Sequence, residues 1–321
     1  MSGRASSRRA VAVTLAIVTV QAVVLGLLAE TSGSATLYAE AAFSVADVGV
    51  ESFLLIGLNR SIRPADPAHP LGYGREAFFW ALFAAVGLFL GGGVASVFQG
   101  VRELGTPAAG GSYLFGYLVI AAITITDGWA LAVSWQALRA HAAASGRPPW
   151  LEVVRTTDPA AATVLLANLV AVVSGPFALA GLALHQATGH GAYDAAGSIV
   201  IGVLLMAASL LLLRLNAGLI TSPSVGARER EAIRARLEAM AGIDQVRELI
   251  AVVTGPRQTL VVARVTLDPD LDRAGVTRAI TSAEHVLAES AGIRAVFVAP
   301  CLTVLNRRGL RITMRRRPLP P

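Results

Sequence analysis

SATLYAEAAFSVADVGVESFLLIGL, residues 34–58, is long and apolar enough to cross a membrane as one helix, yet it carries three carboxylates. The hydrocarbon core of a bilayer is about 30 Å thick, which corresponds to about 20 residues of helix. Glu40, Asp47 and Glu51 follow one another at spacings of seven and four residues, so we predict that they share one helical face. Ionisable side chains inside a membrane span are rare and mark functional positions. This face is therefore expected to point into a helix bundle or a water-filled cavity.

The rest of the chain is similarly apolar. Hydrophobic residues make up 54% of the 321 positions and charged residues only 15%, whereas a soluble domain carries about 25% charged residues. The segments that qualify as membrane spans are 10–29, 34–58, 77–101, 114–138, 159–184 and 193–215. We therefore predict a multi-pass α-helical membrane protein with six transmembrane helices and the lipid bilayer as its main partner.

The distribution of arginine predicts the orientation of these helices. The net charge is +6, and all basic side chains are Arg, which we interpret as a bias in codon composition rather than a nucleic-acid surface. Arg residues precede the first span and occupy the connections between spans two and three and between spans four and five. The alternate connections are nearly free of Arg, Arg102 being the exception. By the positive-inside rule both termini are cytoplasmic, and we expect the cell (plasma) membrane.

The composition changes after about residue 220. Residues 224–242 form an Arg- and Glu-rich amphipathic pattern, 246–255 and 259–268 resemble two strands, 276–292 a second helix and 293–300 a third strand. This order predicts a small C-terminal cytoplasmic α/β domain of the ferredoxin-like type. The predicted domains are a cytoplasmic N-terminus (1–9), a six-helix transmembrane domain (10–219), the ferredoxin-like domain (220–300) and an Arg-rich tail (301–321).

Two further polar residues lie within predicted spans. Asp127 is near the centre of AITITDGWALAVSW (122–135), and Asn168 lies in AATVLLANLVAVV (161–173). Carboxylate and amide oxygens from separate helices can converge on a divalent cation, which would make a cation path. Alternatively, Asp127 is paired or protonated for structural reasons, and Asn168 forms a hydrogen bond across helices.

Short motifs resemble one transporter family. RSIRPADPAHPLGYGREAFFW (60–80) is followed by the glycine-rich LFLGGGVASVFQGVREL (88–104), and TTDPAAATVLLANL (156–169) and YDAAGSIVIGVLL (193–205) come later. Together with the acidic second span and the terminal α/β domain, these stretches resemble the cation diffusion facilitator (cation efflux) family. The branch concerned has an HPxGYGRExxFW loop.

This resemblance implies a dimeric exporter of a divalent metal, usually Zn²⁺ and sometimes Mn²⁺, Fe²⁺, Co²⁺ or Cd²⁺, driven by proton antiport through alternating access. It also implies a metal site between the second and fifth helices. Each of these helices typically supplies His or Asp, then three residues, then Asp. Zn²⁺ suits such a site because four nitrogen or oxygen ligands close around it tetrahedrally. The α/β domain is then expected to serve in dimerisation.

Carried onto this chain, the family motif is incomplete. On the second helix its first ligand position falls on Phe43, which cannot bind metal, and its second falls on Asp47. On the fifth helix the expected His position is Val164, and Ala167 and Asn168 stand where the branch commonly has Glu-Asp. Of the expected ligands, only Asp47 and the weaker Asn168 remain.

Two outcomes are compatible with this pattern. In the first, Asp47 and Asn168 are joined by Glu51 and Asp127 in an oxygen-rich site that suits Mn²⁺, Mg²⁺ or Fe²⁺ better than Zn²⁺. In the second, the chain has lost its site and acts as a membrane scaffold or as the subunit of a heterodimer. We predict the first: a homodimeric secondary active transporter that exports a divalent cation as substrate, with no cofactor. No GxxxxGK[ST] motif occurs, so neither ATP-driven pumping nor enzymatic activity is expected.

Outside the membrane spans, two groups of polar residues could weakly bind a cation. One is the loop with Asp66, His69 and Tyr73, and the other is the run of Asp268, Asp270 and Asp272. For Asp66 we favour a helix-capping role, and for the Asp run an exposed turn between a strand and a helix.

Overall fold

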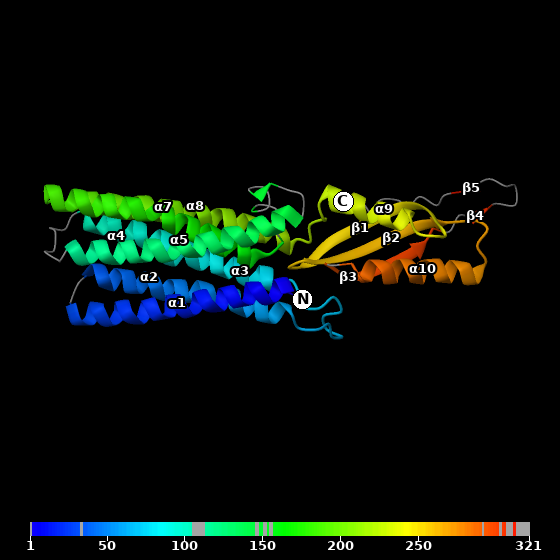
Figure 1. The fold of residues 1–321 in the computed structure, drawn as a ribbon, viewed down its shortest axis with the longest axis horizontal. Coiled ribbons are helices and arrows are strands. Elements are labelled where there is room, and N and C mark those ends of the chain that lie inside the picture. The colour runs from blue at the N-terminus through cyan, green and yellow to red at the C-terminus, as the bar shows by residue number, and fades with distance from the viewer. Residues whose placement is uncertain are drawn as a thin grey trace. The chain divides into compact units, whose positions relative to one another are not determined.

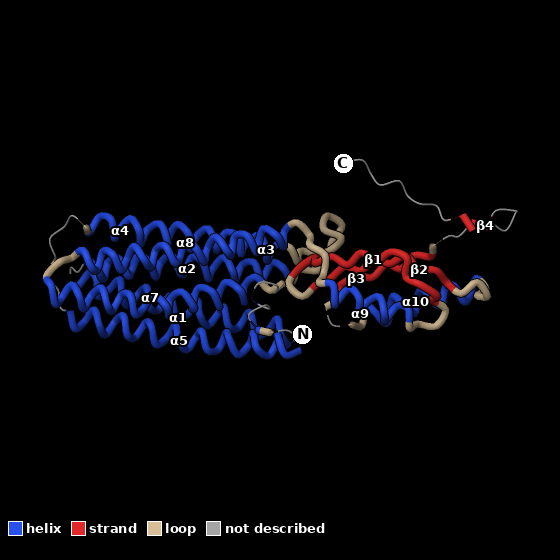
Figure 2. Tube along the Cα trace, turned by 90° about the horizontal axis from the view of Figure 1, so that it is seen from above, coloured by secondary structure: helices blue, strands red, loops and turns tan. Residues whose placement is uncertain are grey.

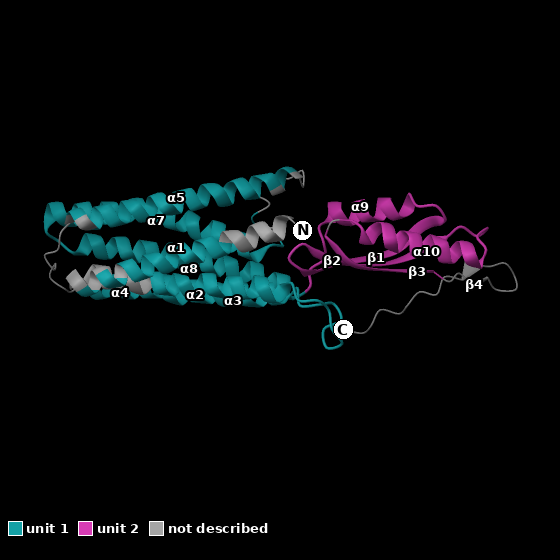
Figure 3. Ribbon diagram, turned by 60° about the horizontal axis from the view of Figure 1, so that its bottom comes forward, with its two compact units in different colours: residues 1–221 teal, residues 222–321 magenta. Residues whose placement is uncertain are grey.

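The computed structural model describes residues 2–32, 35–104, 113–144, 148–149, 153, 157–290, 292–301, 304–305 and 311–312. The side chains of some residues within described helices, including those of Glu40 and Phe43, lie outside this description. The chain divides into two compact units, shown in different colours in Figure 3. We call Met1–Thr221 the membrane unit and Ser222–Pro321 the C-terminal unit.

The membrane unit is a bundle of long helices that run roughly side by side (Figures 1 and 2). Its elements are α1 (Ser2–Ser32), α2 (Ala35–Ser61), α3 (Glu76–Gly87), η1 (Leu88–Val94), α4 (Ala95–Glu103), α5 (Tyr113–Ala144), α7 (Pro159–Thr188) and α8 (Ala192–Ile220). Each predicted span coincides with helix, and α3, η1 and α4 follow one another without a break to form the third.

Four helical stretches among the described residues are long and apolar enough to cross a membrane. They are Glu76–Glu103, Gly116–Ala140, Pro159–Thr188 and Ala192–Ile220. Val11–Val24, within α1, is a shorter apolar helix, and α2 occupies the range of the predicted acidic span. The predicted multi-pass helical membrane fold is thereby confirmed.

The third span contains a π-helical segment. η1 comprises the glycine-rich LFLGGGV, and α8 packs closely against it. A Cβ atom added at Gly202 of α8 would lie 2.7 Å from the carbonyl oxygen of Gly93, and one added at Gly93 would overlap the side chain of Met206. A Cβ atom at Gly100 of α4 would likewise lie 2.7 Å from the carbonyl oxygen of Ala195. Glycine at these positions allows the backbones to approach closely, as is common between helices in membranes.

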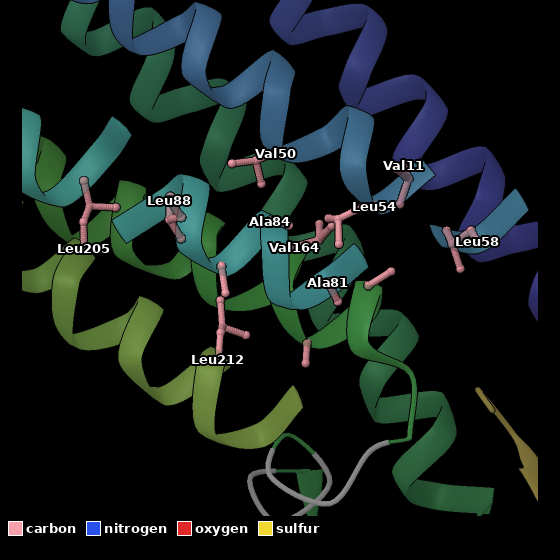
Figure 4. Close-up of a cluster of buried hydrophobic side chains, with 13 residues drawn as sticks. Val11, Val50, Leu54, Leu58, Ala81, Ala84, Leu88, Val164, Leu205 and Leu212 are labelled. Atoms are coloured by element: carbon pink, nitrogen blue, oxygen red, sulfur yellow. The ribbon is translucent and has the colours of Figure 1, made fainter. Parts of the chain in front are cut away.

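Buried apolar side chains connect α1, α2, the third span, α7 and α8, as Figure 4 shows. On α2 the contributors are Val50, Leu54 and Leu58, which are spaced by four residues and therefore lie along one stripe. Asp47 and Glu51 form the neighbouring stripe. Packing of the apolar stripe thus fixes the rotation of α2 and, with it, the direction of its carboxylates.

Helix α7 has well-defined ends. Asp158 is its N-cap, where the side chain accepts a hydrogen bond from the backbone N–H of Ala161 at 3.2 Å, and Pro159 is the first helical residue. Gly189 ends the helix with φ of 72°, a left-handed conformation that glycine adopts without strain. These ends fix the register of α7, which carries Val164, Ala167 and Asn168.

The C-terminal unit has the predicted order of elements: α9 (Ala227–Glu238), β1 (Ile243–Gly255), β2 (Gln258–Leu267), α10 (Arg273–Ala288) and β3 (Ile293–Pro300). The strands lie in the order β1-β2-β3; β1 and β2 are antiparallel, and β2 and β3 are parallel. Both helices lie on one face of the sheet (Figure 2). Leu237 of α9 and Leu287 of α10 are fully buried, as are Val261 and Val265 of β2.

The other face of this sheet carries an apolar row. Ile250 pairs with Val262, and Val262 pairs with Phe297, so the three residues lie side by side across β1, β2 and β3. Ile250 and Phe297 are 49% and 56% exposed. Most of the predicted tail, 301–321, lies outside the described residues. The described part of the tail includes β4 (Val304–Leu305) and β5 (Arg311–Ile312), which form a short antiparallel pair.

Candidate functional site

A cavity of about 450 Å³ lies within the helical bundle of the membrane unit. Its walls come from α1, α2, α5, α7 and α8, with Leu88 of η1 contributing as well. All four residues predicted as metal ligands line it: Asp47 and Glu51 from α2, Asp127 from α5 and Asn168 from α7. The structure therefore brings to one cavity the polar residues that the sequence distributes over three separate spans.

The carboxylates from α2 lie one helical turn apart. Glu51 is only 6% exposed, and its Oε2 atom has no hydrogen-bond partner among the described residues. When ionised, Asp47 would repel a negative charge on Glu51 or on Asp127 in the same cavity. A buried polar atom without a partner is costly, which makes Glu51 a candidate ligand for a cation in the cavity.

On α7, Asn168 also has an unsatisfied atom. Its Nδ2 has no hydrogen-bond partner among the described residues, and the same is true of Oγ of the buried Ser174. The structural alternative for this residue was a hydrogen bond across helices. Asn168 donates no such bond to any described residue. Val164 and Ala167, which occupy ligand positions of the family motif, also line the cavity. Phe43 lies in α2, and its side chain is outside the described part of the chain.

Several hydroxyl groups join the carboxylates in the wall. Thr124 and Thr126 of α5 donate to the carbonyl oxygens of Ile120 and Ile123, each at 2.8 Å. Thr163 of α7 donates in the same way to its own helix. Because the hydroxyl protons are used within the helices, the oxygen lone pairs remain as possible ligands or water acceptors.

These hydroxyl groups are not among the site residues predicted from the sequence. Thr124 precedes Asp127 by three residues, and Ser174 belongs to the stripe of α7 that includes Ala167 and Ala171, so helical spacing was the available signal.

The cavity is strongly anionic. Three carboxylates line it, and no Arg or His stands among the described residues of its wall. Across the described part of the chain, however, no three His, Cys, Asp or Glu side chains come close enough together to hold a metal ion. The carboxylates thus surround an open space and do not form a compact ligand cage.

The other predicted groups lie outside this cavity. Asp66 accepts hydrogen bonds from the Tyr73 hydroxyl at 2.6 Å and from the backbone N–H of His69 at 2.7 Å. These hydrogen bonds, that from Tyr73 first, lower the pKa of Asp66 and hold the loop in its turn. Asp272 caps α10 by accepting from Gly275 N at 2.6 Å, which gives the Asp run a structural role.

Residues 11–220 match the family described as the cation efflux transmembrane domain. The chain belongs to the cation efflux family. The matched range includes every residue found to line the cavity, so the cavity lies inside the domain that defines the family.

Curated members with sequence similarity come from animals and plants. The chain is 28% identical over 247 residues to proton-coupled zinc antiporter SLC30A9, mitochondrial, of Mus musculus, an alignment that covers 77% of this chain and 43% of that protein. The Homo sapiens protein of the same name gives the same values. Metal tolerance protein C4 of Arabidopsis thaliana is 30% identical over 226 residues, covering 70% of this chain and 50% of that protein. The chain spans about half the length of the curated relatives it matches.

Proposed function

We propose that the protein is a secondary active transporter that exports a divalent metal cation across the membrane in exchange for protons. The observation that carries this proposal is the anionic cavity, which gathers Asp47, Glu51 and Asp127 within a cation efflux domain and has no basic residue in its described wall. Uncompensated carboxylates in a low-dielectric interior are costly unless a cation or protons neutralise them.

Proton exchange follows from the same groups. A carboxylate must lose its proton to bind a metal, so metal binding releases protons and protonation expels the metal. If the cavity opens alternately to the two sides of the membrane, this competition couples the two flows. The cation is then the transported substrate and not a resident cofactor, and the protein acts as a transporter and not as an enzyme.

Assembly and orientation are part of the proposal. The Arg-rich connections favour a cytoplasmic position for both termini, and we propose the cell membrane as the location. We also infer a homodimer in which the apolar row Ile250–Val262–Phe297 contributes to the contact, because a sheet face of this kind is rarely left exposed. The mass of the purified protein, determined by light scattering with the detergent subtracted, tests the dimer. A monomer that persists at high concentration contradicts it.

Transport in proteoliposomes tests the function. Wild-type protein should move Mn²⁺, Fe²⁺ or Zn²⁺ across the membrane with an opposing proton flux when a pH gradient is imposed. Asp47→Asn should reduce this transport to the empty-liposome level. Asp194→Asn is a matched control, because Asp194 lies in the first turn of α8 and does not line the cavity. If none of these cations moves above the background, the export proposal is wrong and the scaffold or heterodimer alternative takes its place.

A further inference from the structure

The described wall of the cavity offers only oxygen atoms as metal ligands. Carboxylates, the amide oxygen of Asn168 and the hydroxyl groups of Ser and Thr are present, whereas His, Cys and Met are absent from the described lining. Imidazole and thiolate ligands favour Zn²⁺ and other softer ions, and carboxylate, carbonyl and water ligands favour Mg²⁺, Ca²⁺ and Mn²⁺. The described lining therefore lacks the imidazole and thiolate ligands with which proteins select zinc, and its oxygen ligands suit Mn²⁺.

The size of the cavity also favours an oxygen-preferring cation. Its volume is about 450 Å³, and no three of the described acidic side chains gather closely enough to hold a metal ion together. A water molecule takes up about 30 Å³ of liquid volume, so the cavity has room for a cation with part of its hydration shell. Hard cations of this class commonly retain several waters when protein carboxylates bind them, whereas Zn²⁺ sites close tightly around four ligands.

Glu51 identifies where such an ion would bind. Its side chain is more than nine-tenths buried, it lines the cavity, and Oε2 has no hydrogen-bond partner among the described residues. Asp158, by contrast, is a buried carboxylate that accepts a hydrogen bond from the backbone N–H of Ala161. Asp47, one turn earlier on the same helix, places a second carboxylate beside it.

We propose that this cavity binds a partly hydrated, oxygen-preferring divalent cation of the Mn²⁺ class, with Glu51 and Asp47 as its anionic ligands and Asp127 facing it across the cavity. This assignment rests on the proposed function, since it names the substrate class of the same site. It departs from the ligand set that the family motif implies, because Glu51 stands outside that motif and Asp127 comes from a different helix.

Electron paramagnetic resonance of Mn²⁺ tests the assignment on the purified full-length protein in detergent. Free Mn²⁺ gives a sharp signal that is lost on binding, so titration yields the affinity without any transport measurement. Wild-type protein should bind Mn²⁺, and Zn²⁺ should compete with it no more strongly than it does for simple carboxylate ligands, because no imidazole or thiolate in the described lining favours zinc. Spectra recorded in deuterated water should show exchangeable deuterons near the bound ion, because part of its shell remains water.

Substitution of Glu51 tests the ligand. Loss of groups that merely support a metal ligand costs about 10- to 100-fold in affinity, so Glu51→Gln should weaken Mn²⁺ binding at least about tenfold. Glu51→Asp, which keeps the charge, should bind more tightly than Glu51→Gln, and Asp194→Asn should match wild type. Size-exclusion profiles and thermal unfolding of each variant show whether the fold is retained.

The outcomes separate this assignment from the proposed function. Asp47-dependent transport of Zn²⁺ by a protein that does not bind Mn²⁺ would overturn the assignment and leave the export proposal intact. Equal Mn²⁺ affinity in wild type and Glu51→Gln would remove Glu51 from the site. Binding of Mn²⁺ without transport of any cation would support the assignment and contradict the export proposal.

Discussion

The carboxylates of the two units differ in what surrounds them. In the C-terminal unit, Asp272 accepts from Gly275 N, Glu238 accepts from Val246 N at 3.1 Å, and Glu284 accepts from Val298 N at 3.0 Å. Each of these groups satisfies a backbone donor: Asp272 caps its own helix, whereas Glu238 links α9 to β1 and Glu284 links α10 to β3.

In the membrane unit, by contrast, an oxygen of Glu51 has no hydrogen-bond partner within the described ranges, and Asp47, when ionised, would repel its acidic neighbours. Carboxylates of the first kind stabilise the fold. Those of the second kind cost stability, and the proposed cation would account for their presence.

The largest expected effect comes from neutralising carboxylates in the membrane cavity. The double substitution Asp47→Asn with Asp127→Asn should lower transport at least about 100-fold, since it removes two anionic groups from the cavity. The same change should raise the free energy of unfolding by about 1 kcal/mol, because it relieves repulsion at a strained functional site. Transport in proteoliposomes and thermal unfolding monitored by tryptophan fluorescence measure the two effects. A variant that is both inactive and less stable than wild type would contradict the comparison.

A nitrogen ligand should change which metal the cavity prefers. Val164 lines the wall, so Val164→His would add an imidazole and should raise the affinity for Zn²⁺ relative to Mn²⁺ by at least about tenfold. Competition between the two ions, followed by the Mn²⁺ signal, measures the ratio. Ala178→His is the control, because this position also lines the cavity but lies about 21 Å further along α7. An equal gain in both variants would mean that the added imidazole acts without regard to position.

Removing a structural carboxylate should have the opposite pattern. Asp272→Ala should destabilise the start of α10 by about 1 kcal/mol, the usual value of an N-cap, and leave transport unchanged. Hydrogen exchange of the α10 amides, read by mass spectrometry, reports this loss. Asp272→Asn retains a capping side chain and should exchange almost as slowly as wild type. Reduced transport in Asp272→Ala would show that the two kinds of carboxylate are not independent.

The smallest effect concerns Asp66. The hydrogen bond from Tyr73 lowers the pKa of Asp66, so the ionised carboxylate stabilises the loop above the ordinary pKa of Asp, and this contribution is lost as the pH falls through the lowered pKa of the folded state. Tyr73→Phe should therefore raise the pKa of Asp66 towards its ordinary range. NMR titration of protein labelled with ¹³C at the Asp carboxyl groups measures the change. An unchanged titration would assign the stabilisation to the backbone N–H of His69 instead.

Much of this architecture was accessible from the sequence, for identifiable reasons. Apolar length located the helices, and the alternation of helix and strand patterns gave the order of elements in the C-terminal unit. Helical spacing predicted that Asp47 and Glu51 share one face of α2. The free-energy cost of placing polar side chains inside a membrane marked Asp127 and Asn168 as candidate site residues.

The openness of the cavity was not accessible, because helical periodicity gives the direction of a side chain but not the distance across a bundle. The π-helical turn at η1 also escaped prediction, since its glycines are equally compatible with an ordinary close-packed helix.

That π-helical turn bears on how the third span tolerates changes in length. A π turn closes a hydrogen bond over one residue more than an α turn, so η1 accommodates extra chain between fixed ends. Deleting one residue within η1 can convert it to regular α-helix and leave Gly100 opposite Ala195 of α8. The same deletion in the part of α4 before Gly100 would rotate all later residues by roughly 100° and carry Gly100 out of that contact. Within the described part of this span, single-residue deletions should therefore be accepted at η1 and rejected in the helical turns that follow it.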